Sequence, residues 1–266
     1  MTQSPSDGWN AGQTYDDFMG RWSRPLAIEF LRWLRPDAGL HWLDVGCGTG
    51  ALSAAICRAA NPATVLGCDP SAPFVAAAKG FVKDPRAGFV EGGTGALPYR
   101  EGGYDAVVSG LALNFFPDPG PAVREQLGAL RSGGVLGAYV WDYAVGMGFL
   151  RCFWDAAIAV TSDAERVDEG RRFSICNPEP LLSLFTAAGV TGVRVGTISI
   201  DTEFSSFEDF WNPFLGGTGP APSFVAALGE NQREELAARL RGRLPSDGLG
   251  RIAMTARAWA VAGSAA

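Results

Sequence analysis

A glycine-rich turn constrains this chain more than any other feature of its sequence. Residues 43–50 read LDVGCGTG, and they join an apolar stretch typical of a buried strand to a segment with helical spacing. Glycines in such a turn allow positive φ and let a ligand approach bare backbone. Asp69 ends the next predicted strand, where a carboxylate faces the same crevice and accepts ribose hydroxyl protons. The turn and Asp69 together predict a site for a nucleoside-containing cofactor.

Asp44 narrows the choice of cofactor. Gly46, Gly48 and Ala51 formally satisfy the dinucleotide-binding pattern. However, Asp44 lies near the position of a pyrophosphate, and contact between two anions there costs on the order of a few kcal/mol. S-adenosylmethionine (SAM) carries an ammonium and a sulfonium group and no phosphate, so it removes this conflict. Asp44 therefore favours SAM, and a nicotinamide-dependent oxidoreductase remains a disfavoured alternative.

The hydrophobic periodicity predicts an α/β fold. Strands are expected at 40–45, 64–69, 88–91, 104–109 and 135–141. Helices are expected at 51–59 and 119–131, and a further one, with Ser71 as its N-cap, through Val82. This alternation implies right-handed crossovers and a parallel sheet. Before it, one helix is expected around Trp22 and a second from Pro25. After it, helices are expected at 148–161, 179–188, 207–215 and 231–243, and strands at 190–204 and 252–261.

These elements predict a doubly wound, mostly parallel, seven-stranded sheet whose last two strands pair antiparallel at one edge. Residues 1–266 are expected to form one domain. Residues 1–36 are expected to be an N-terminal helical cap, and residues 205–249 a helical insertion over the active site.

Composition excludes several classes of partner and site. With 22 Lys and Arg against 28 Asp and Glu the net charge is −6, which argues against nucleic acid and anionic membranes as partners. We see no apolar window long enough to span a membrane and no signal peptide at the N-terminus. The five cysteines form no CxxC and there is one histidine, so no metal site is expected, and reduced thiols favour the cytoplasm. The arginine-rich, lysine-poor composition favours a bacterial source.

Further motifs give the chain a family resemblance. After the glycine turn and Asp69 come the runs ALPY at 96–99, YDAVVS at 104–109, FPDP at 116–119 and LRSGG at 130–134. As a set they resemble class I, Rossmann-like SAM-dependent methyltransferases, in particular the ubiquinone/menaquinone-biosynthesis type. The resemblance extends over about residues 15–142.

The resemblance implies the cofactor-binding residues. Asp44 would hold the ammonium group, and Asp69 the ribose hydroxyls. The other implied cofactor contacts are Gly46, Cys47, Gly48 and Gly50 in the turn, Pro70 or Ser71 and Thr94 and Gly95 at the adenine, and Ser109, Gly110 and Leu111 at the methionine. Tyr15 would close over SAM, and Arg24 or Arg21 would meet its carboxylate. One departure is Gly93, since many relatives carry there an Asp that binds the adenine amino group.

Residues for the acceptor are less constrained. Asp142 and Tyr143 end the fifth strand, where they would orient or deprotonate an acceptor, or where the carboxylate would cap the loop. Asn114 would bind the substrate or fix its own loop. Trp211 and Phe214 lie in the insertion, and an aromatic cap there suits an apolar or aromatic small molecule. His41 precedes its strand, away from the ligand end, and is interpreted as structural.

The sequence therefore predicts transfer of a methyl group from SAM to a small-molecule acceptor, in a cytoplasmic monomer or homodimer. Two alternatives keep the cofactor: another SAM-using enzyme, such as a cyclase or decarboxylase, and a non-catalytic SAM-binding module.

Overall fold

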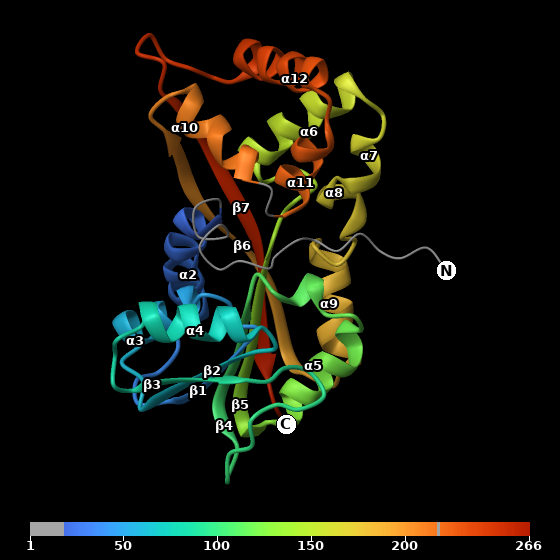
Figure 1. Ribbon diagram of the computed structural model, residues 1–266. Helices are drawn as coiled ribbons and strands as arrows, with labels where there is room; N and C mark the ends of the chain where they lie inside the picture. Colours follow the sequence, from blue (N-terminus) through green and yellow to red (C-terminus); the bar gives the residue numbers. More distant parts are fainter. Residues whose placement is uncertain (1–18, 217–218) are drawn as a thin grey trace.

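A seven-stranded sheet organises the protein. The computed structural model describes residues 19–216 and 219–266 (Figure 1). The strands lie in the order β3-β2-β1-β4-β5-β7-β6. They are β1 (His41–Val45), β2 (Thr64–Asp69), β3 (Ala87–Glu91), β4 (Tyr104–Gly110), β5 (Leu130–Trp141), β6 (Thr191–Phe204) and β7 (Ile252–Ser264). Strands β1 to β5 pair in parallel, and β7 runs antiparallel between β5 and β6. The predicted fold class and the antiparallel pairing of the last two strands are confirmed.

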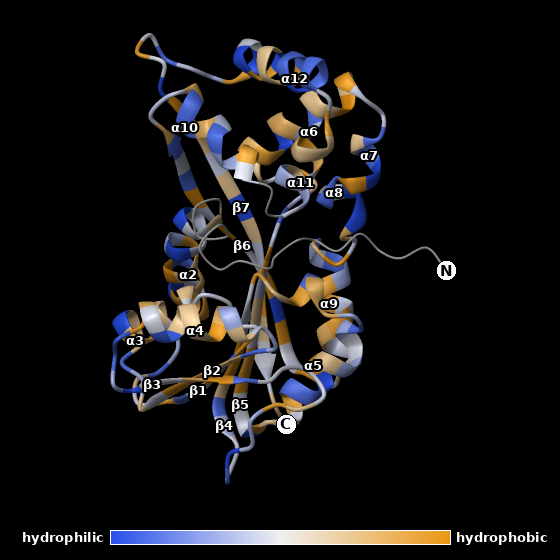
Figure 2. Cartoon of the chain, viewed as in Figure 1, coloured by the Kyte–Doolittle hydropathy of each residue, from blue (hydrophilic) through white to orange (hydrophobic). Residues whose placement is uncertain are grey.

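Helices cover both faces of the sheet (Figure 1). Helices α2 (Arg21–Leu34), α3 (Ala51–Ala59) and α4 (Ala72–Phe81) lie on one side, and α5 (Pro119–Gly128) and α9 (Pro178–Ala187) on the other. Figure 2 shows apolar residues gathered on the central strands, whereas α12 (Glu230–Arg243) is largely hydrophilic. Among the described residues, none of the helices is both long and apolar enough to cross a bilayer.

Helix α2 corrects one expectation. Pro25 does not begin a second helix, because it lies inside α2 near its start. Pro25 is the fifth residue of α2, so the helix lacks the single hydrogen bond that an N–H at this position would donate to the carbonyl of Arg21. The continuous helix buries Trp22, Leu26 and Phe30, and the ring of Phe30 lies 4.6 Å from that of Tyr139 on β5.

A second boundary is also shifted. Strand β5 already begins at Leu130, whereas the strand is expected from residue 135 and the preceding helix to residue 131. The early pairing of Tyr104 with Leu130 is followed by a register shift between Tyr104 and Ala106. An irregularity in the hydrogen-bond ladder between β4 and β5 thus accommodates Gly133 and Gly134 within the strand. The alternation of apolar and polar residues in the sequence does not reveal such an irregularity.

Further helices gather beyond the carboxyl ends of the parallel strands, around the long pair β6 and β7 (Figure 1). They are α6 (Gly148–Val160), α7 (Ala164–Val167), α8 (Glu169–Arg172), α10 (Phe207–Trp211), η3 (Asn212–Gly216), α11 (Pro220–Ala227) and α12. In this group α12 packs on α6, and α11 packs on α7. The four-residue helices α7 and α8 are too short to produce a period in the sequence.

One contiguous hydrophobic core joins the sheet to these helices and includes Phe30, Trp42 and Phe214. Such continuity is consistent with a single domain, which stays a prediction.

Candidate functional site

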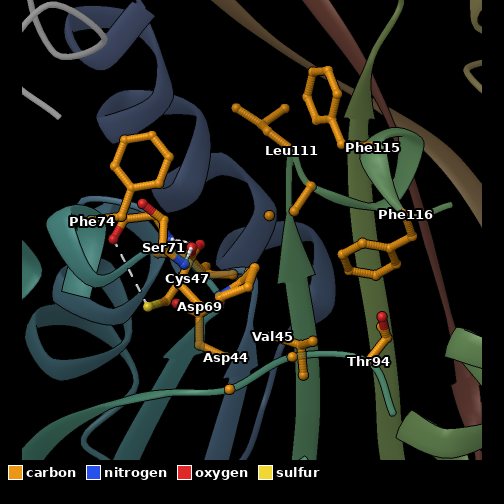
Figure 3. A pocket seen from close by; sticks show the side chains of 18 of the residues that line it. Asp44, Val45, Cys47, Asp69, Ser71, Phe74, Thr94, Leu111, Phe115 and Phe116 are labelled. Atoms are coloured by element: carbon orange, nitrogen blue, oxygen red, sulfur yellow. Dashed lines mark hydrogen bonds between the residues drawn. The ribbon is translucent and has the colours of Figure 1, made fainter. Parts of the chain in front are cut away.

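A cavity of about 810 Å³ opens at the carboxyl ends of β1, β2 and β4 (Figure 3). It is lined by the turn after β1, the start of α4, the loop after β3 and the segment after β4. Of the predicted cofactor residues, the cavity brings together Asp44, Gly46, Cys47, Gly48, Asp69, Pro70, Ser71, Thr94, Gly110 and Leu111. Ligands bind at this edge of doubly wound sheets, since the loops of neighbouring strands meet there.

The three glycines of the turn, Gly46, Gly48 and Gly50, have different structural roles. All have positive φ: 73° at Gly46, 52° at Gly48 and 89° at Gly50. A Cβ on Gly46 would lie 2.6 Å from Cβ of Ala112, and one on Gly50 would lie 2.9 Å from Cγ2 of Val82. These two glycines therefore allow close packing, and Gly50 is not among the lining residues. Gly48 has no heavy atom within 4 Å of the Cβ position, which leaves its backbone open to a ligand.

Asp69 is fixed at the end of β2 by backbone donors. Gly48 donates its N–H to Oδ2 over 3.0 Å, and Ser71 donates its N–H to Oδ1 over 2.9 Å. Burial raises the pKa of Asp69 above its ordinary value, and the two hydrogen bonds oppose that rise. Each carboxylate oxygen keeps a further lone pair, so Asp69 can still accept two hydroxyl protons from the cavity. Ser71 itself precedes α4, but its side chain makes no capping hydrogen bond.

Asp44 is fully buried at the floor of the cavity (Figure 3). Ser53 Oγ donates to Oδ2 of Asp44 over 2.7 Å, while Oδ1 has no hydrogen-bond partner among the described residues. Desolvation by burial, opposed by the hydrogen bond from Ser53 and reinforced by the nearby charge of Asp69, raises the pKa of Asp44 to about 7. A buried carboxylate oxygen without a partner is costly, so this site fits a ligand with a cationic group.

The loop after β3 is held by a residue that the sequence did not single out. Glu125 on α5 accepts the N–H of Gly95 at Oε2 over 2.6 Å and the N–H of Leu97 at Oε1 over 3.2 Å. Gly95 lies outside the lining, whereas Thr94 and Gly93 line the cavity. No spacing in the sequence links Glu125 to this loop, because the two meet only through the packing of α5 beside the sheet.

The far side of the cavity is apolar. Figure 3 shows Leu111, Phe115 and Phe116 opposite Phe74 and Ser71. Leu111 has a φ of 59°, a strained value for a branched side chain, and its N–H donates to the carbonyl of Tyr139 over 2.8 Å. This bond holds the segment after β4 against β5, so the apolar wall is fixed by the sheet.

Several predicted acceptor residues lie away from the cavity lining. Asp142 accepts hydrogen bonds from Nε of Arg257 (2.8 Å), Nη2 of Arg257 (2.5 Å) and the N–H of Val145 (3.1 Å). These contacts agree with the capping alternative for Asp142. Tyr143 packs against Phe173 at a ring distance of 5.7 Å.

Aromatic residues within 205–249 pack into the shared hydrophobic core, in part against α6. The ring of Phe214 stacks on that of Phe153 at 4.4 Å, and Trp211 lies 6.1 Å from Phe214. Neither they nor Asn114 line the cavity, although both amide atoms of Asn114 are buried and unpartnered within the described chain. Their roles toward a substrate stay predictions without support from the cavity.

The remaining candidates are the N-terminal residues and Ser109. Arg21 pairs with Asp209 over 2.8 Å, and the Arg24 guanidinium lies over Phe81 at 4.7 Å. Tyr15 lies outside the described residues. Ser109 is buried in β4 beside the cavity without lining it.

His41 is structural in its surroundings. At the start of β1 its Nδ1 lies 2.8 Å from Thr64 Oγ1. The cavity lies at the other end of the sheet.

Comparison with known proteins agrees with this geometry. A family described as a methyltransferase domain matches residues 43–138. The chain contains a class I SAM-dependent methyltransferase domain. The predicted family is thereby confirmed, and with it the cofactor class, SAM. The match begins at the glycine turn and ends in β5, so it covers all of the lining residues of the cavity except Ser23 and Tyr139.

Curated relatives share this part of the chain. Trans-aconitate 2-methyltransferase of Deinococcus radiodurans is 35% identical over 133 residues, which are 50% of this chain and 49% of the relative. Nocamycin O-methyltransferase of Saccharothrix syringae is 32% identical over 127 residues, 46% of this chain and 45% of the relative. The match thus spans about half the length of these curated relatives.

Solved structures share the methyltransferase fold over most of the chain. Phosphoethanolamine N-methyltransferase 2 of Haemonchus contortus, in complex with SAM, has a TM-score of 0.58 at 17% identity, covering 96% of this chain and 57% of that one. A putative methyltransferase of Bacillus halodurans has a TM-score of 0.57 at 14% identity, covering 90% and 97%. The domain is therefore embedded in a fold of the same class that includes β6 and β7.

Proposed function

We propose that the protein transfers a methyl group from SAM to a small-molecule acceptor that is apolar or aromatic. The observation that carries the cofactor is Asp44, a buried carboxylate with one unpartnered oxygen at the floor of the cavity. The apolar wall formed by Leu111, Phe115 and Phe116 supports the acceptor class.

Each part of the cavity has a role in holding the cofactor. Asp44 pairs with the ammonium group and Asp69 accepts the ribose hydroxyl protons, while the open backbone of Gly48 lets the cofactor approach. Thr94, in the loop that Glu125 holds, meets the adenine. Arg24 is our candidate for the carboxylate of SAM, a role that the family resemblance implies for Arg24 or Arg21.

Positioning accounts for the catalysis. When bound, SAM would supply an electrophilic methyl group and, as the leaving group, S-adenosylhomocysteine. Within the described residues the lining offers carboxylates but no lysine or histidine as a base, which favours an acceptor that is already nucleophilic. The protein contributes by aligning the two reactants and by excluding water with apolar side chains.

The wider biological setting follows from the sequence predictions. We propose a single domain of bacterial origin that acts in the cytoplasm as a monomer or homodimer, without nucleic acid as a partner. The acidic net charge of −6 supports the last point.

Calorimetric titration tests the cofactor assignment. We expect SAM and S-adenosylhomocysteine to bind the purified protein at micromolar concentration and NAD not to bind. Asp69→Ala should weaken both SAM-type ligands, while Asp201→Ala, at an exposed position on β6, should not. Binding of NAD alone, or of none of the three, would refute the proposal.

Product formation separates transfer from the alternatives. A methyltransferase forms S-adenosylhomocysteine in step with a methylated acceptor, whereas a SAM-using cyclase or decarboxylase binds SAM without forming that product. A non-catalytic module would bind SAM and turn over no acceptor in a screen.

A further inference from the structure

The described charged side chains that line the cavity are all acidic. Its lining includes the carboxylates of Asp44, Asp69 and Glu91 and, in the described part of the chain, no lysine, arginine or histidine. Asp44 and Asp69 have places in cofactor binding. The ammonium of SAM balances Asp44, and the hydroxyls that Asp69 accepts are neutral. Arg24, our candidate for the carboxylate of SAM, would be balanced by that carboxylate. The loaded cavity therefore offers an incoming acceptor no protein cation beyond those that the cofactor already engages.

Residues outside the described ranges do not change this balance. Residues 1–18 contain Asp7, Asp16 and Asp17 but no lysine, arginine or histidine, and residues 217–218 are Gly and Thr. Wherever these segments lie, they bring no cationic side chain to the cavity.

Neighbouring guanidinium groups are already paired outside the lining. Arg21 binds Asp209 across the junction of α2 and α10, and Arg257 binds Asp142 beyond the end of β5. Turning either one toward the cavity would leave a carboxylate without its partner, and Asp142 is almost fully buried.

The apolar lining at the acceptor end of the cavity increases the energetic cost of binding an anionic acceptor. Beyond β4 the lining is Leu111, Ala112, Phe115, Phe116 and Pro117, with Tyr139 behind them. An anionic group placed there loses its hydration and gains no cationic side chain from the described lining, and the single positive charge of the SAM sulfonium is opposed by Asp69 and Glu91 across the cavity. A neutral group loses little.

We propose that the acceptor site selects by charge: it takes an acceptor that is neutral or cationic and rejects carboxylates and phosphates. This inference rests on the proposed function and narrows it. It separates this protein from its relative named for trans-aconitate, which is a polycarboxylate. The residues after β4 are thus specificity-determining residues.

A pair of fluorescent probes tests the charge rule without turnover. N-phenyl-1-naphthylamine is neutral, and 8-anilinonaphthalene-1-sulfonate has the same aromatic frame with one negative charge. The protein is first saturated with S-adenosylhomocysteine, whose binding is verified by calorimetry. We expect the neutral probe to bind this complex about tenfold more tightly than the sulfonate or better.

Variants at Phe116 place the probe in this cavity. Phe116→Arg supplies a cation and should shift the binding ratio toward the sulfonate by about fivefold or more. Phe116→Met changes shape without charge and should leave the ratio near that of the unmodified protein. Thermal unfolding verifies that both variants fold, and the ratio for the unmodified protein stands as a test by itself.

The outcomes separate this inference from the proposed function. Failure of S-adenosylhomocysteine to bind refutes the proposed function. If it binds, equal or tighter binding of the sulfonate, or no binding of either probe, refutes the charge rule. Methylation of trans-aconitate at a rate comparable with neutral acceptors would also refute it.

Discussion

Ser53 Oγ donates a hydrogen bond to Oδ2 of Asp44 over 2.7 Å, and the other oxygen of that carboxylate has no partner among the described residues. Half of the carboxylate is thus satisfied by α3 and half faces the cavity. Because burial raises the pKa of Asp44 to about 7, the empty site exchanges a proton near neutral pH. This relationship governs both ligand affinity and stability.

Binding of SAM should weaken on acidification. Pairing with the ammonium group requires ionised Asp44, and a group with a pKa of about 7 is mostly ionised at pH 8 and mostly protonated at pH 6. We expect an affinity loss of about tenfold between those two pH values, measured by calorimetry. Asp44→Asn should bind weakly with a much flatter pH dependence. An unchanged affinity in the unmodified protein would contradict the prediction.

The same carboxylate should destabilise the ligand-free protein at high pH. In the unfolded chain its pKa is near 3.8, so between pH 4 and 7 the folded state holds a proton that the unfolded state has lost. Stability from this group is therefore present at low pH and decreases as pH rises to 7. Ionised Asp44 costs on the order of 4 kcal/mol at pH 8, and an unpaired amide costs about 1–3 kcal/mol.

The net effect of Asp44→Asn is thus a gain of about 1–3 kcal/mol at pH 8 that shrinks or reverses at pH 5. Urea unfolding of the ligand-free protein at both pH values measures it. Ser53→Ala, which removes the hydrogen bond but keeps the carboxylate, should instead lower stability at pH 8. A destabilised Asp44→Asn at pH 8 would contradict the prediction.

Local patterns predicted the fold well because its central elements obey local rules. The strand that ends at Asp69 and the helix that starts at Ala51 have the predicted bounds, since a run of β-branched or apolar residues and a glycine turn each act over a few positions. The start of α2 was wrong, because whether a proline begins a helix depends on the residues before it.

Contacts made by tertiary packing were not predictable from one sequence. Ser53, Glu125 and Arg257 reach the site or its surroundings from α3, α5 and β7, and nothing in their own neighbourhood marks them. Conversely, Phe214 has the composition of a ligand-contacting aromatic but stacks on Phe153. Residue type alone does not distinguish an aromatic core from an aromatic pocket.

Glu125 should act as a positioning residue for the loop after β3. Glu125→Ala removes the acceptor for the N–H groups of Gly95 and Leu97, so the loop is no longer held in its position beside the cofactor site. We expect the KM for SAM to rise about three- to tenfold with kcat little changed.

Hydrogen exchange distinguishes this role from a general loss of stability. The amides of Gly95 and Leu97 should exchange faster in Glu125→Ala, while amides of β1 keep their protection. Arg124→Ala, on an exposed part of the same helix, is the matched control and should change neither quantity. Unaltered exchange at both amides would contradict the role.

Arg257 should stabilise the fold through Asp142 without taking part in cofactor binding. The Asp142 side chain is 3% exposed, and Arg257→Ala leaves its charge with only the N–H of Val145 as a partner. We expect a loss of about 2–4 kcal/mol in urea unfolding, and a smaller loss in the double variant with Asp142→Asn, because that variant leaves no unpaired charge. The affinity for SAM should stay within about twofold, since neither side chain lines the cavity. The opposite pattern, in which Asp142→Asn abolishes turnover and leaves stability intact, would restore Asp142 as a catalytic residue and show that the loop rearranges around it when an acceptor binds.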